Sequence, residues 1–561
     1  MGNIFLDLTI IICIAGFLSL VFRFFKQPEI LAYILTGVII ASFHFFSQSN
    51  QDALQTMSQV GVTLLLFMVG LEIRISELLS LGKSLILVSL GQIFLTFGSA
   101  FLLSSFFLID PLTSFYIATA ATFSSTIVVV KLLSDQHELH SLHAKFSVGI
   151  LLAQDVVAIL FLMILSGFGK TLVSSNLLLT SLLILTKGVI LIGAIWVLSK
   201  YAFPKILEFI ARSSETLFLV SLAWAFGLAA VVSSKYIGFS IEIGGFLAGV
   251  ALANSMVNYQ IIAKAKILRD FFIVIFFVLL GIQMSFANAI QIIIPAVILS
   301  AFILLIKPFI VMALLGVLGY RKRTAFLTGV SLSQLSEFSL ILVFMGYKLG
   351  HINTQTVSII TLSSLITFAV STYGITHWKT LYKKASGKLG FVERKVKKDE
   401  INAGEEFESL KDHVVVIGGD QMGQSIMEAL DGKGKEVVVV DFDPAIVKKL
   451  EDRKVHRLFG DIADLDIQEK AQIDEAKLVI STIPDVEDNL MLLKELRHEN
   501  RRAKVVMMAL DSRDAKLLYK NGADYVVLPH LAGGRQVAKI IVDNHISSIE
   551  DLKKKDLAYL S

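Results

Sequence analysis

Long apolar runs follow one another through the first two thirds of the chain, and charged residues gather mainly in the short intervals between them. The pattern predicts about thirteen membrane-spanning helices, because a crossing helix needs about 20 apolar residues. The predicted spans are residues 4–25, 29–46, 53–73, 84–108, 112–133, 146–168, 176–199, 215–233, 237–254, 270–286, 288–318, 324–347 and 353–378.

Basic residues alternate from one interval to the next. Every second interval is rich in lysine and arginine, and these residues are Arg23, Lys26, Arg74, Lys83, Lys131, Lys145, Lys200, Lys205, Arg212, Lys264, Lys266, Arg269, Arg321, Lys322 and Arg323. The opposite intervals carry only Lys170, Lys235 and Lys348. Lysine and arginine collect on the cytoplasmic side of a membrane. We therefore expect the N-terminus outside and the C-terminus inside, and an odd number of spans gives the same orientation.

The pattern changes after residue 382. Residues 383–411 form a charged linker, and short apolar strands then alternate with amphipathic helices. The predicted strands are residues 413–418, 436–441, 455–459, 477–483, 504–510 and 524–529. This alternation predicts a doubly wound parallel sheet, an α/β Rossmann-like fold. The expected domains are a transmembrane domain at 1–382, the linker at 383–411, a nucleotide-binding-type domain at 412–546 and a tail at 547–561.

Composition supports a membrane class and excludes several others. Hydrophobic residues make up 55% of the chain and charged residues 17%, and the mean hydropathy is +0.72. Cys13 is the single cysteine, which excludes a disulfide framework and a cysteine metal site. The net charge of +4 comes with no single basic face, so we expect no nucleic-acid partner. We expect a multi-pass protein of the cell inner (plasma) membrane, surrounded by lipid.

Four ionisable residues fall inside predicted spans, namely Asp155, Lys187, Lys307 and Glu337. Such residues cost a few kcal/mol at bilayer depth and commonly mark transport pathways. Asp155 and Lys307 either form a permanent structural pair or take part in transport, and both interpretations stay open on the sequence. Lys187 lies in the span that links the two halves of the domain, where a structural role is the stronger expectation.

Two spans carry clusters of polar residues near their middle. The segment ATFSSTIV in span 112–133 contains Ser125 and Thr126, and SLSQLSEF in span 324–347 contains Glu337. The hydroxyls either bond back to their own helix or mark helices that break near the midplane and line an ion site. If spans 1–6 and 8–13 are two repeats, both clusters lie in the fifth span of a repeat. A shift of seven spans inverts the second repeat, which is an architecture of secondary transporters.

Five segments together resemble the cation:proton antiporter-2 family, and most closely the Kef-type potassium/proton antiporters. These segments are GVTLLLFMVGLEI (61–73), LLAQDVVAI (151–159), GFLAGVALANS (245–255), RDFFIVIFFVLLGIQMS (269–285) and LSQLSEFSLIL (332–342). The resemblance implies that Asp155 binds the monovalent cation and the proton, that Gln154 is its neighbour in the site, and that Lys307 is the basic partner. It favours potassium over sodium because glutamine precedes the aspartate.

The same resemblance covers the C-terminal domain, which looks like a potassium-conductance-regulating (RCK, TrkA-N) domain. In IGGDQMGQ (417–424), the spacing from Gly418 to Gly423 matches a phosphate-binding turn, and Asp441 ends the next strand where a ribose-binding acid belongs. Asp461, in GDIAD, belongs to another matching segment. Asp420 occupies the second-glycine position, where its carboxylate would repel a pyrophosphate. The domain binds an adenine nucleotide (AMP, ADP, ATP or NAD/NADH), or it is a dimerisation module with an empty cleft.

Three function classes compete. A secondary antiporter would couple potassium efflux, or alternatively sodium transport, to proton entry by alternating access under control of the RCK domain. A ligand-gated potassium channel would need a TVGYG-like filter, which the sequence lacks. A membrane-anchored dehydrogenase would need a catalytic acid or base beside the glycine-rich turn, so we expect no enzyme. The expected partners of the antiporter are potassium or sodium, protons, a second copy in a homodimer and an ancillary regulatory subunit.

Overall fold

The chain divides into two compact units in the computed structural model. One unit comprises Met1–Gln136 and His143–Glu393, and the other comprises His137–Leu142 and Arg394–Ser561. The structure describes residues 4–43, 51–72, 83–107, 109–136, 138, 141–168, 186–188, 190–191, 193–203, 207, 210, 213–234, 237–253, 255, 257–284, 289–318, 320, 322–385, 410–431, 435–441, 444–450, 455–460, 462, 465–483, 486–500 and 502–542.

Every element of regular secondary structure among the described residues of the first unit is a helix. Its elements are α1 (Ile4–Phe24), α2 (Glu29–Ser42), α3 (Gln51–Glu72), α5 (Lys83–Phe106), α6 (Pro111–Thr122), α7 (Thr126–Asp135), α8 (Leu142–Phe168), η3 (Leu198–Ala202), α11 (Ser214–Val232), α12 (Ile241–Leu252), α13 (Asn258–Ile282), α14 (Ala289–Ala301), η4 (Phe302–Ile306), α15 (Lys307–Val317), α16 (Lys322–Ser331), α17 (Glu337–Lys348), α18 (Thr354–Thr376) and α19 (Trp378–Ala385).

Among the described residues, eight segments are long and apolar enough to cross a membrane, two of which join consecutive helices. Helices α2 and α12 are apolar but shorter, and the predicted span 176–199 lies mostly outside the described residues. The predicted span 270–286 is the apolar half of α13, which begins earlier, at Asn258. The expected polytopic α-helical membrane domain is therefore confirmed.

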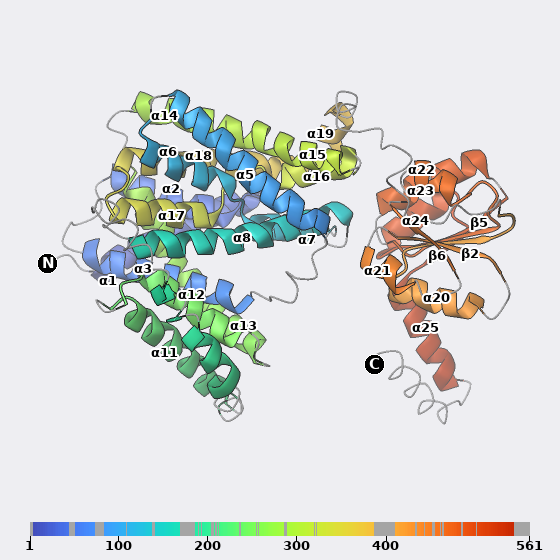
Figure 1. Cartoon of the computed structure of the whole chain (residues 1–561), viewed down its shortest axis with the longest axis horizontal. Helices are drawn as coiled ribbons and strands as arrows, with labels where there is room; N and C mark the ends of the chain where they lie inside the picture. Colours follow the sequence, from blue (N-terminus) through green and yellow to red (C-terminus); the bar gives the residue numbers. More distant parts are fainter. Residues whose placement is uncertain are drawn as a thin grey trace. The chain divides into compact units, whose positions relative to one another are not determined.

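The helices of this unit pack as two bundles (Figure 1). By their contacts, α1, α2, α3, α11, α12 and α13 form one, and α5 to α8 with α14 to α18 form the other; α2 overlaps the second bundle in the view of Figure 1. In the first bundle, glycines allow two close crossings. Gly37 of α2 lies against Gly281 of α13, and Gly249 of α12 lies against Gly70 of α3. A Cβ atom at any of these four positions would overlap the backbone of the facing helix. In the expected inverted repeat, α2 corresponds to α12 and α3 corresponds to α13. The repeat therefore maps the crossing of α2 with α13 onto the crossing of α12 with α3.

Both predicted helix breaks are present in the second bundle. Helix α6 ends at Thr122, and α7 begins at Thr126 after three non-helical residues. Helix α16 ends at Ser331, and α17 begins at Glu337. Serines cap both second halves, since Ser125 accepts a hydrogen bond from the N–H of Val128 and Ser336 from that of Phe338. The two broken helices of the predicted fold are confirmed.

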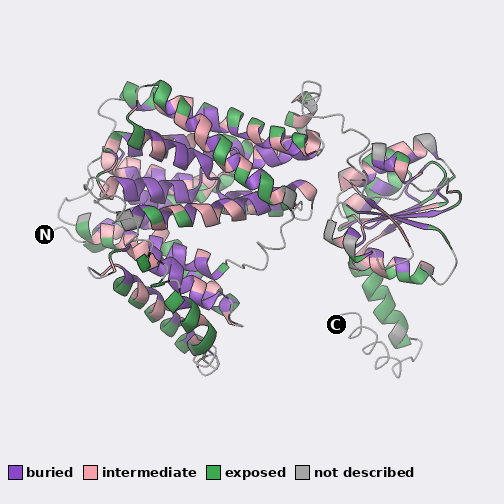
Figure 2. Ribbon diagram, in the orientation of Figure 1, coloured by how far each residue is buried: buried purple, intermediate pink, exposed green. Residues whose placement is uncertain are grey.

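The second unit contains a six-stranded parallel sheet in the order β3-β2-β1-β4-β5-β6. The strands are β1 (Val414–Ile417), β2 (Val437–Asp441), β3 (His456–Phe459), β4 (Leu478–Ser481), β5 (Lys504–Met508) and β6 (Tyr525–Val527). The helices are α20 (Gln421–Asp431), α21 (Pro444–Lys449), α22 (Leu465–Lys470), α23 (Val486–Glu499), α24 (Ser512–Lys520) and α25 (Pro529–Val542). Strands β1 and β2 are fully buried (Figure 2), as expected for a parallel sheet covered on both faces. This confirms the predicted doubly wound sheet.

Candidate functional site

The two broken helices cross each other at their non-helical residues. The hydroxyl of Ser124 donates to the carbonyl of Leu332 at 2.9 Å, and the side-chain amide of Gln334 donates to the carbonyl of Ser125 at 3.2 Å. Ser339, one turn into α17, donates to the carbonyl of Ala120 at 2.7 Å. The carbonyls of Leu332 and Ala120 lie at the ends of the first half helices, where a broken helix leaves carbonyls without intrahelical partners, so each break is stabilised by the other.

Lys307 lies where the first half helices end, and its side chain is fully buried. Its ammonium donates to the carbonyls of Ala121 at 3.1 Å, Phe123 at 2.9 Å and Gln334 at 3.1 Å. The expectation of a carboxylate partner is therefore wrong for this structure. The physical reason is that carbonyls at helix C-termini carry partial negative charge and attract a cation.

The two carboxylates lie at the opposite ends, where the second half helices begin. Glu337 is the first residue of α17, and its Oε1 accepts a 2.7 Å hydrogen bond from the hydroxyl of Ser125, the N-cap of α7. Asp155 on α8 accepts a 2.8 Å hydrogen bond at Oδ2 from the hydroxyl of Thr126, the first residue of α7. Helix N-termini carry partial positive charge. Both carboxylates therefore lie in a favourable field.

Gln154 supports the first break from α8. Its Oε1 accepts from the N–H of Ser124 at 2.9 Å, and its Nε2 donates to Oε1 of Gln92 at 2.6 Å. Gln92 in turn donates to the carbonyl of Thr122 at 3.2 Å. Gln154 is fully buried, so its amide holds the break in place behind Asp155.

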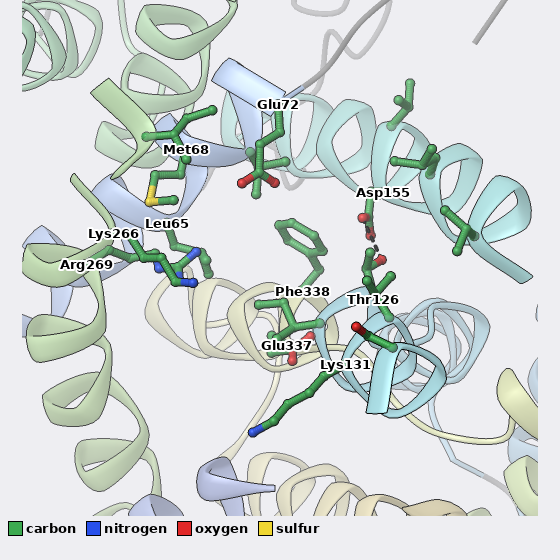
Figure 3. Close-up of a pocket in the computed structure, with 18 of the residues that line it drawn as sticks. Leu65, Met68, Glu72, Thr126, Lys131, Asp155, Lys266, Arg269, Glu337 and Phe338 are labelled. Carbon is green, nitrogen blue, oxygen red and sulfur yellow. Dashed lines mark hydrogen bonds between the residues drawn. The ribbon is translucent and has the colours of Figure 1, made fainter. Parts of the chain in front are cut away.

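A cavity of about 670 Å³ opens beside Asp155 and Glu337. It lies between the two bundles, because Thr126, Asp155 and Glu337 line one wall and helices α3 and α13 line the other. Figure 3 shows Asp155 and Thr126 pointing toward one another, and Glu72, Lys266 and Arg269 on the far wall. Lys131, Lys266 and Arg269 belong to the intervals with the excess of basic residues. The cavity therefore reaches from the crossing toward that side.

Some residues of this region were not predicted from the sequence. Gln92 is a lone amide in an apolar span, and Ser371 of α18 donates to Oε1 of Gln334 at 2.6 Å. Glu72 and Arg269 line the cavity from the other bundle. For Gln92, the available signal was an amide side chain inside a long apolar run. For Glu72, it was a carboxylate at the end of an apolar run.

The glycine-rich turn of the second unit follows β1. Gly418 adopts φ +90°, and a Cβ on Gly423 would overlap the carbonyl of Gly418, so both positions require glycine. Asp441 is buried at the end of β2, and its Oδ2 accepts a 2.7 Å hydrogen bond from the N–H of Gly419. Asp441 therefore orders the turn, while Asp420 is exposed at the turn itself. Asp461 lies outside the described residues.

Two family matches cover both units. Residues 8–379 match the family described as sodium/hydrogen exchanger, transmembrane, and residues 414–529 match the TrkA-N domain. The chain belongs to the sodium/hydrogen exchanger family. This is a family of transporters rather than enzymes. The predicted arrangement, a cation:proton antiporter domain followed by an RCK (TrkA-N) domain, is confirmed.

Individual relatives and a solved structure agree with this assignment. The chain is 29% identical over 363 residues to the iron transporter MagA of Paramagnetospirillum magneticum, covering 64% of this chain and 82% of MagA. It is 24% identical over 490 residues to the glutathione-regulated potassium-efflux system protein KefC of Salmonella schwarzengrund, covering 86% of this chain and 76% of KefC. The sodium proton antiporter MjNhaP1 of Methanocaldococcus jannaschii has a similar fold, with a TM-score of 0.50, 15% identity, and coverage of 69% of this chain and 97% of MjNhaP1.

Proposed function

We propose that the protein exchanges potassium for protons by alternating access, with Asp155 as the exchange site and potassium efflux coupled to proton entry. The observation that carries the proposal is the position of Asp155. It lines a cavity at the crossing of two broken helices, and Thr126 at the start of a half helix holds its carboxylate. Ion sites of secondary transporters are built from such half-helix ends.

Competition at one carboxylate supplies the coupling. Asp155 accepts either a proton or a monovalent cation, and each neutralises the same negative charge. The Asp155 side chain is partly exposed at the cavity wall, so both ions reach it from the same side. The hydroxyl of Thr126 and the partial positive charge at the start of α7 stabilise the negative carboxylate after one ion has left and before the other binds.

Lys307 serves as a fixed cation in the frame of the site. Its three carbonyl bonds lie at the ends of the first half helices, on the other side of the breaks from Asp155 and Glu337. It keeps the breaks open and the N-terminal ends of α7 and α17 directed at the carboxylates. Glu337, held by Ser125, is the second carboxylate of the site.

The two bundles supply the alternating movement. The glycine crossings lock α2 to α13 and α3 to α12, so this bundle acts as a static frame. The other bundle carries Asp155 and moves against the frame, which closes the present cavity and opens one on the opposite face. The cavity reaches the side rich in basic residues, which supports assigning this conformation as cytoplasm-facing, with the N-terminus outside.

Potassium is the favoured cation, and sodium/proton antiport is the alternative within the same family. Glutamine precedes Asp155, and a relative that shares both domains is described as a potassium-efflux system protein. Gln154 acts indirectly, because both ends of its amide are bonded to Gln92 and Ser124. It sets the position of the break and hence the size of the site. A ligand-gated potassium channel is the weaker candidate.

The C-terminal unit acts as the cytoplasmic regulator. The ordered turn at Gly418 and Gly423 and the 3-2-1-4-5-6 strand order support binding of an adenine nucleotide (AMP, ADP, ATP or NAD/NADH) at the carboxyl ends of the strands. In this proposal Asp441 contributes to binding by ordering the turn, and Asp461 remains a candidate from the sequence alone. The protein is a plasma-membrane homodimer paired through this unit, and an ancillary subunit completes its regulation.

Proton movement in proteoliposomes tests the function. A potassium gradient should drive proton flux faster than an equal gradient of sodium or ferrous iron, and AMP or NADH added on the RCK side should change the rate. Faster flux with sodium would favour the alternative antiporter. Cation flux without any proton movement would overturn the proposal in favour of a channel or a uniporter.

A further inference from the structure

Trp378, the first residue of α19, makes a cluster of contacts at the inner ends of the helices that carry the site. Its indole N–H donates to Oε1 of Gln136 at 3.0 Å. The guanidinium of Arg323 lies 5.4 Å from the centre of its ring, and the imidazole ring of His143 lies 6.2 Å away. Trp378 is almost fully buried. A single side chain therefore joins three other segments.

Each of these segments leads to the exchange site. Gln136 is the C-cap of α7, which begins with Thr126. His143 is in the first turn of α8, the helix that carries Asp155. Arg323 is in the first turn of α16, which runs into the second break.

Gln136 fixes the end of α7 at two points. Besides accepting from Trp378, it donates from Nε2 to the carbonyl of Ile375, at the end of α18, at 2.9 Å. Helix α7 has ten residues, and a helix this short moves as one rigid rod of about 15 Å. A displacement of its Gln136 end is therefore transmitted to Thr126, whose hydroxyl holds Asp155.

Helix α19 is also attached to α16 at a second point. The rings of Tyr382 and Phe326 are 5.6 Å apart. Its sequence, WKTLYKKA, is amphipathic, and the chain continues from it into the linker and the C-terminal unit. Trp378 and Tyr382 thus attach the segment that leads to that unit to the half helices α7 and α16.

We propose that Trp378 is a positioning residue of the exchange site, which through Gln136 sets the position of α7 and so the hydrogen bond from Thr126 to Asp155. The inference rests on the proposed exchange at Asp155. It adds a route by which the C-terminal unit alters the affinity of that site for its cation. Movement of α19 alters the hydrogen bond from Trp378 to Gln136. The resulting displacement of α7 then shifts Thr126 relative to Asp155.

Substitutions that remove this hydrogen bond test the proposal in the full chain. Trp378→Phe keeps a ring beside Arg323 but loses the N–H donor, and Gln136→Leu removes the acceptor together with the bond from Gln136 to the carbonyl of Ile375. Each should raise the KM for potassium by roughly three- to tenfold, the factor one hydrogen bond typically supplies, with a smaller change in maximal rate. The double variant should have the same KM as Gln136→Leu alone, because Gln136→Leu already removes the bond that Trp378→Phe removes.

Trp224→Phe is the matched control. The indole N–H of Trp224 donates to the carbonyl of Ala248 at 3.1 Å inside the other bundle, away from the half helices. This variant should leave the KM at the wild-type value. An unchanged KM in Trp378→Phe, or an equal rise in Trp224→Phe, would overturn the proposal.

Hydrogen exchange measured by mass spectrometry separates this proposal from the proposed function. In Trp378→Phe, amides of α7 and of residues 123–125 should exchange faster than in wild type and in Trp224→Phe, whichever ion is transported. If potassium drives no proton flux in wild type but α7 exchange rises, the function is wrong and the positioning role stands. Unchanged exchange in α7 would contradict the positioning role directly.

Discussion

The hydroxyl of Ser125 donates to the carboxylate of Glu337 at 2.7 Å, although the two residues are 212 positions apart in the chain. Ser125 caps α7, and Glu337 is the first residue of α17. Both side chains are buried. This bond therefore joins the N-terminal ends of the two half helices at the point where the cavity reaches the crossing.

Replacing Ser125 with alanine should destabilise the protein and slow exchange. The change removes the N-cap of α7 and the partner of Glu337, which together cost about 1–3 kcal/mol. Thermal unfolding in detergent should show a lower apparent Tm, and proteoliposomes should show slower potassium-driven proton flux. Ser99→Ala is the control, since Ser99 donates to the carbonyls of Leu95 and Thr96 within its own helix. Equal behaviour of the two variants would show that the link between the half helices contributes nothing specific.

Lys307→Met should be more damaging to the fold than any other single change at the site. It leaves three buried carbonyls without their donor, and breaking such a buried charged contact costs about 3–5 kcal/mol. The expected result is a large fall in apparent Tm and in the yield of folded protein. Lys187→Met is the comparison, because Lys187 is exposed and donates to the carbonyl of Ile237 at 3.3 Å. A fully stable Lys307→Met variant that has lost transport would instead assign Lys307 to the ion exchange itself.

The sequence was sufficient to predict the membrane helices, both helix breaks and the parallel sheet. Each follows from a local pattern, namely long apolar runs, polar clusters inside such runs, and short strands alternating with helices. The candidates Asp155, Glu337, Ser125 and Thr126 were visible because ionisable and hydroxyl groups are rare at membrane depth. The structure adds that they lie together at one crossing.

The partner of Lys307 could not be predicted in the same way. A sequence shows which side chains carry charge, but the carbonyls that a broken helix leaves free appear only once the two breaks cross. Gln92 was missed for a related reason, because its role depends on bonds to Gln154 and Thr122 from other helices. The cavity walls from α3 and α13 likewise depend on how the bundles pack.

Asp441→Ala should weaken any adenine-nucleotide binding to the C-terminal unit. The carboxylate of Asp441 holds the N–H of Gly419 at 2.7 Å, so its loss releases the turn that would receive phosphate. Isothermal titration of the detergent-solubilised protein with AMP and with NADH measures the change. Asp420→Ala is the matched variant, and removing this exposed carboxylate should leave affinity unchanged or raise it. Equal affinity in Asp441→Ala and wild type would place the nucleotide elsewhere.

Asp524 should stabilise the C-terminal unit in a way that depends on pH. Burial alone would raise the pKa of this carboxyl, but hydrogen bonds from Lys504, the N–H of Val505 and Arg497 outweigh burial and hold it at about 2. Its contribution is therefore complete above its ordinary pKa of 3.8 and is lost as the pH falls through about 2.

Asp524→Asn should consequently lower the free energy of unfolding of the C-terminal unit by up to about 1 kcal/mol near neutral pH. The effect is no larger because partly exposed ion pairs are screened by solvent. The difference should vanish toward pH 2, where the wild-type carboxyl is itself protonated. The rates of pepsin cleavage of the variant and of wild type, measured between about pH 2 and pH 5, should become equal as the pH falls. Asp474→Asn is the control, because Asp474 is exposed. A difference in cleavage rate between Asp524→Asn and wild type that stays constant down to the lowest pH would contradict the stabilising role of the Asp524 carboxylate.

The most direct test of the account is potassium-driven proton flux by Asp155→Asn in proteoliposomes at matched protein density. Asparagine keeps the size of the side chain and accepts the hydrogen bond from Thr126, but it neither titrates nor carries charge. The account predicts that flux falls to the level of empty vesicles, while apparent Tm and oligomeric state remain those of wild type. Near wild-type flux in the folded variant would contradict the central claim and make Glu337 the exchange site to test next.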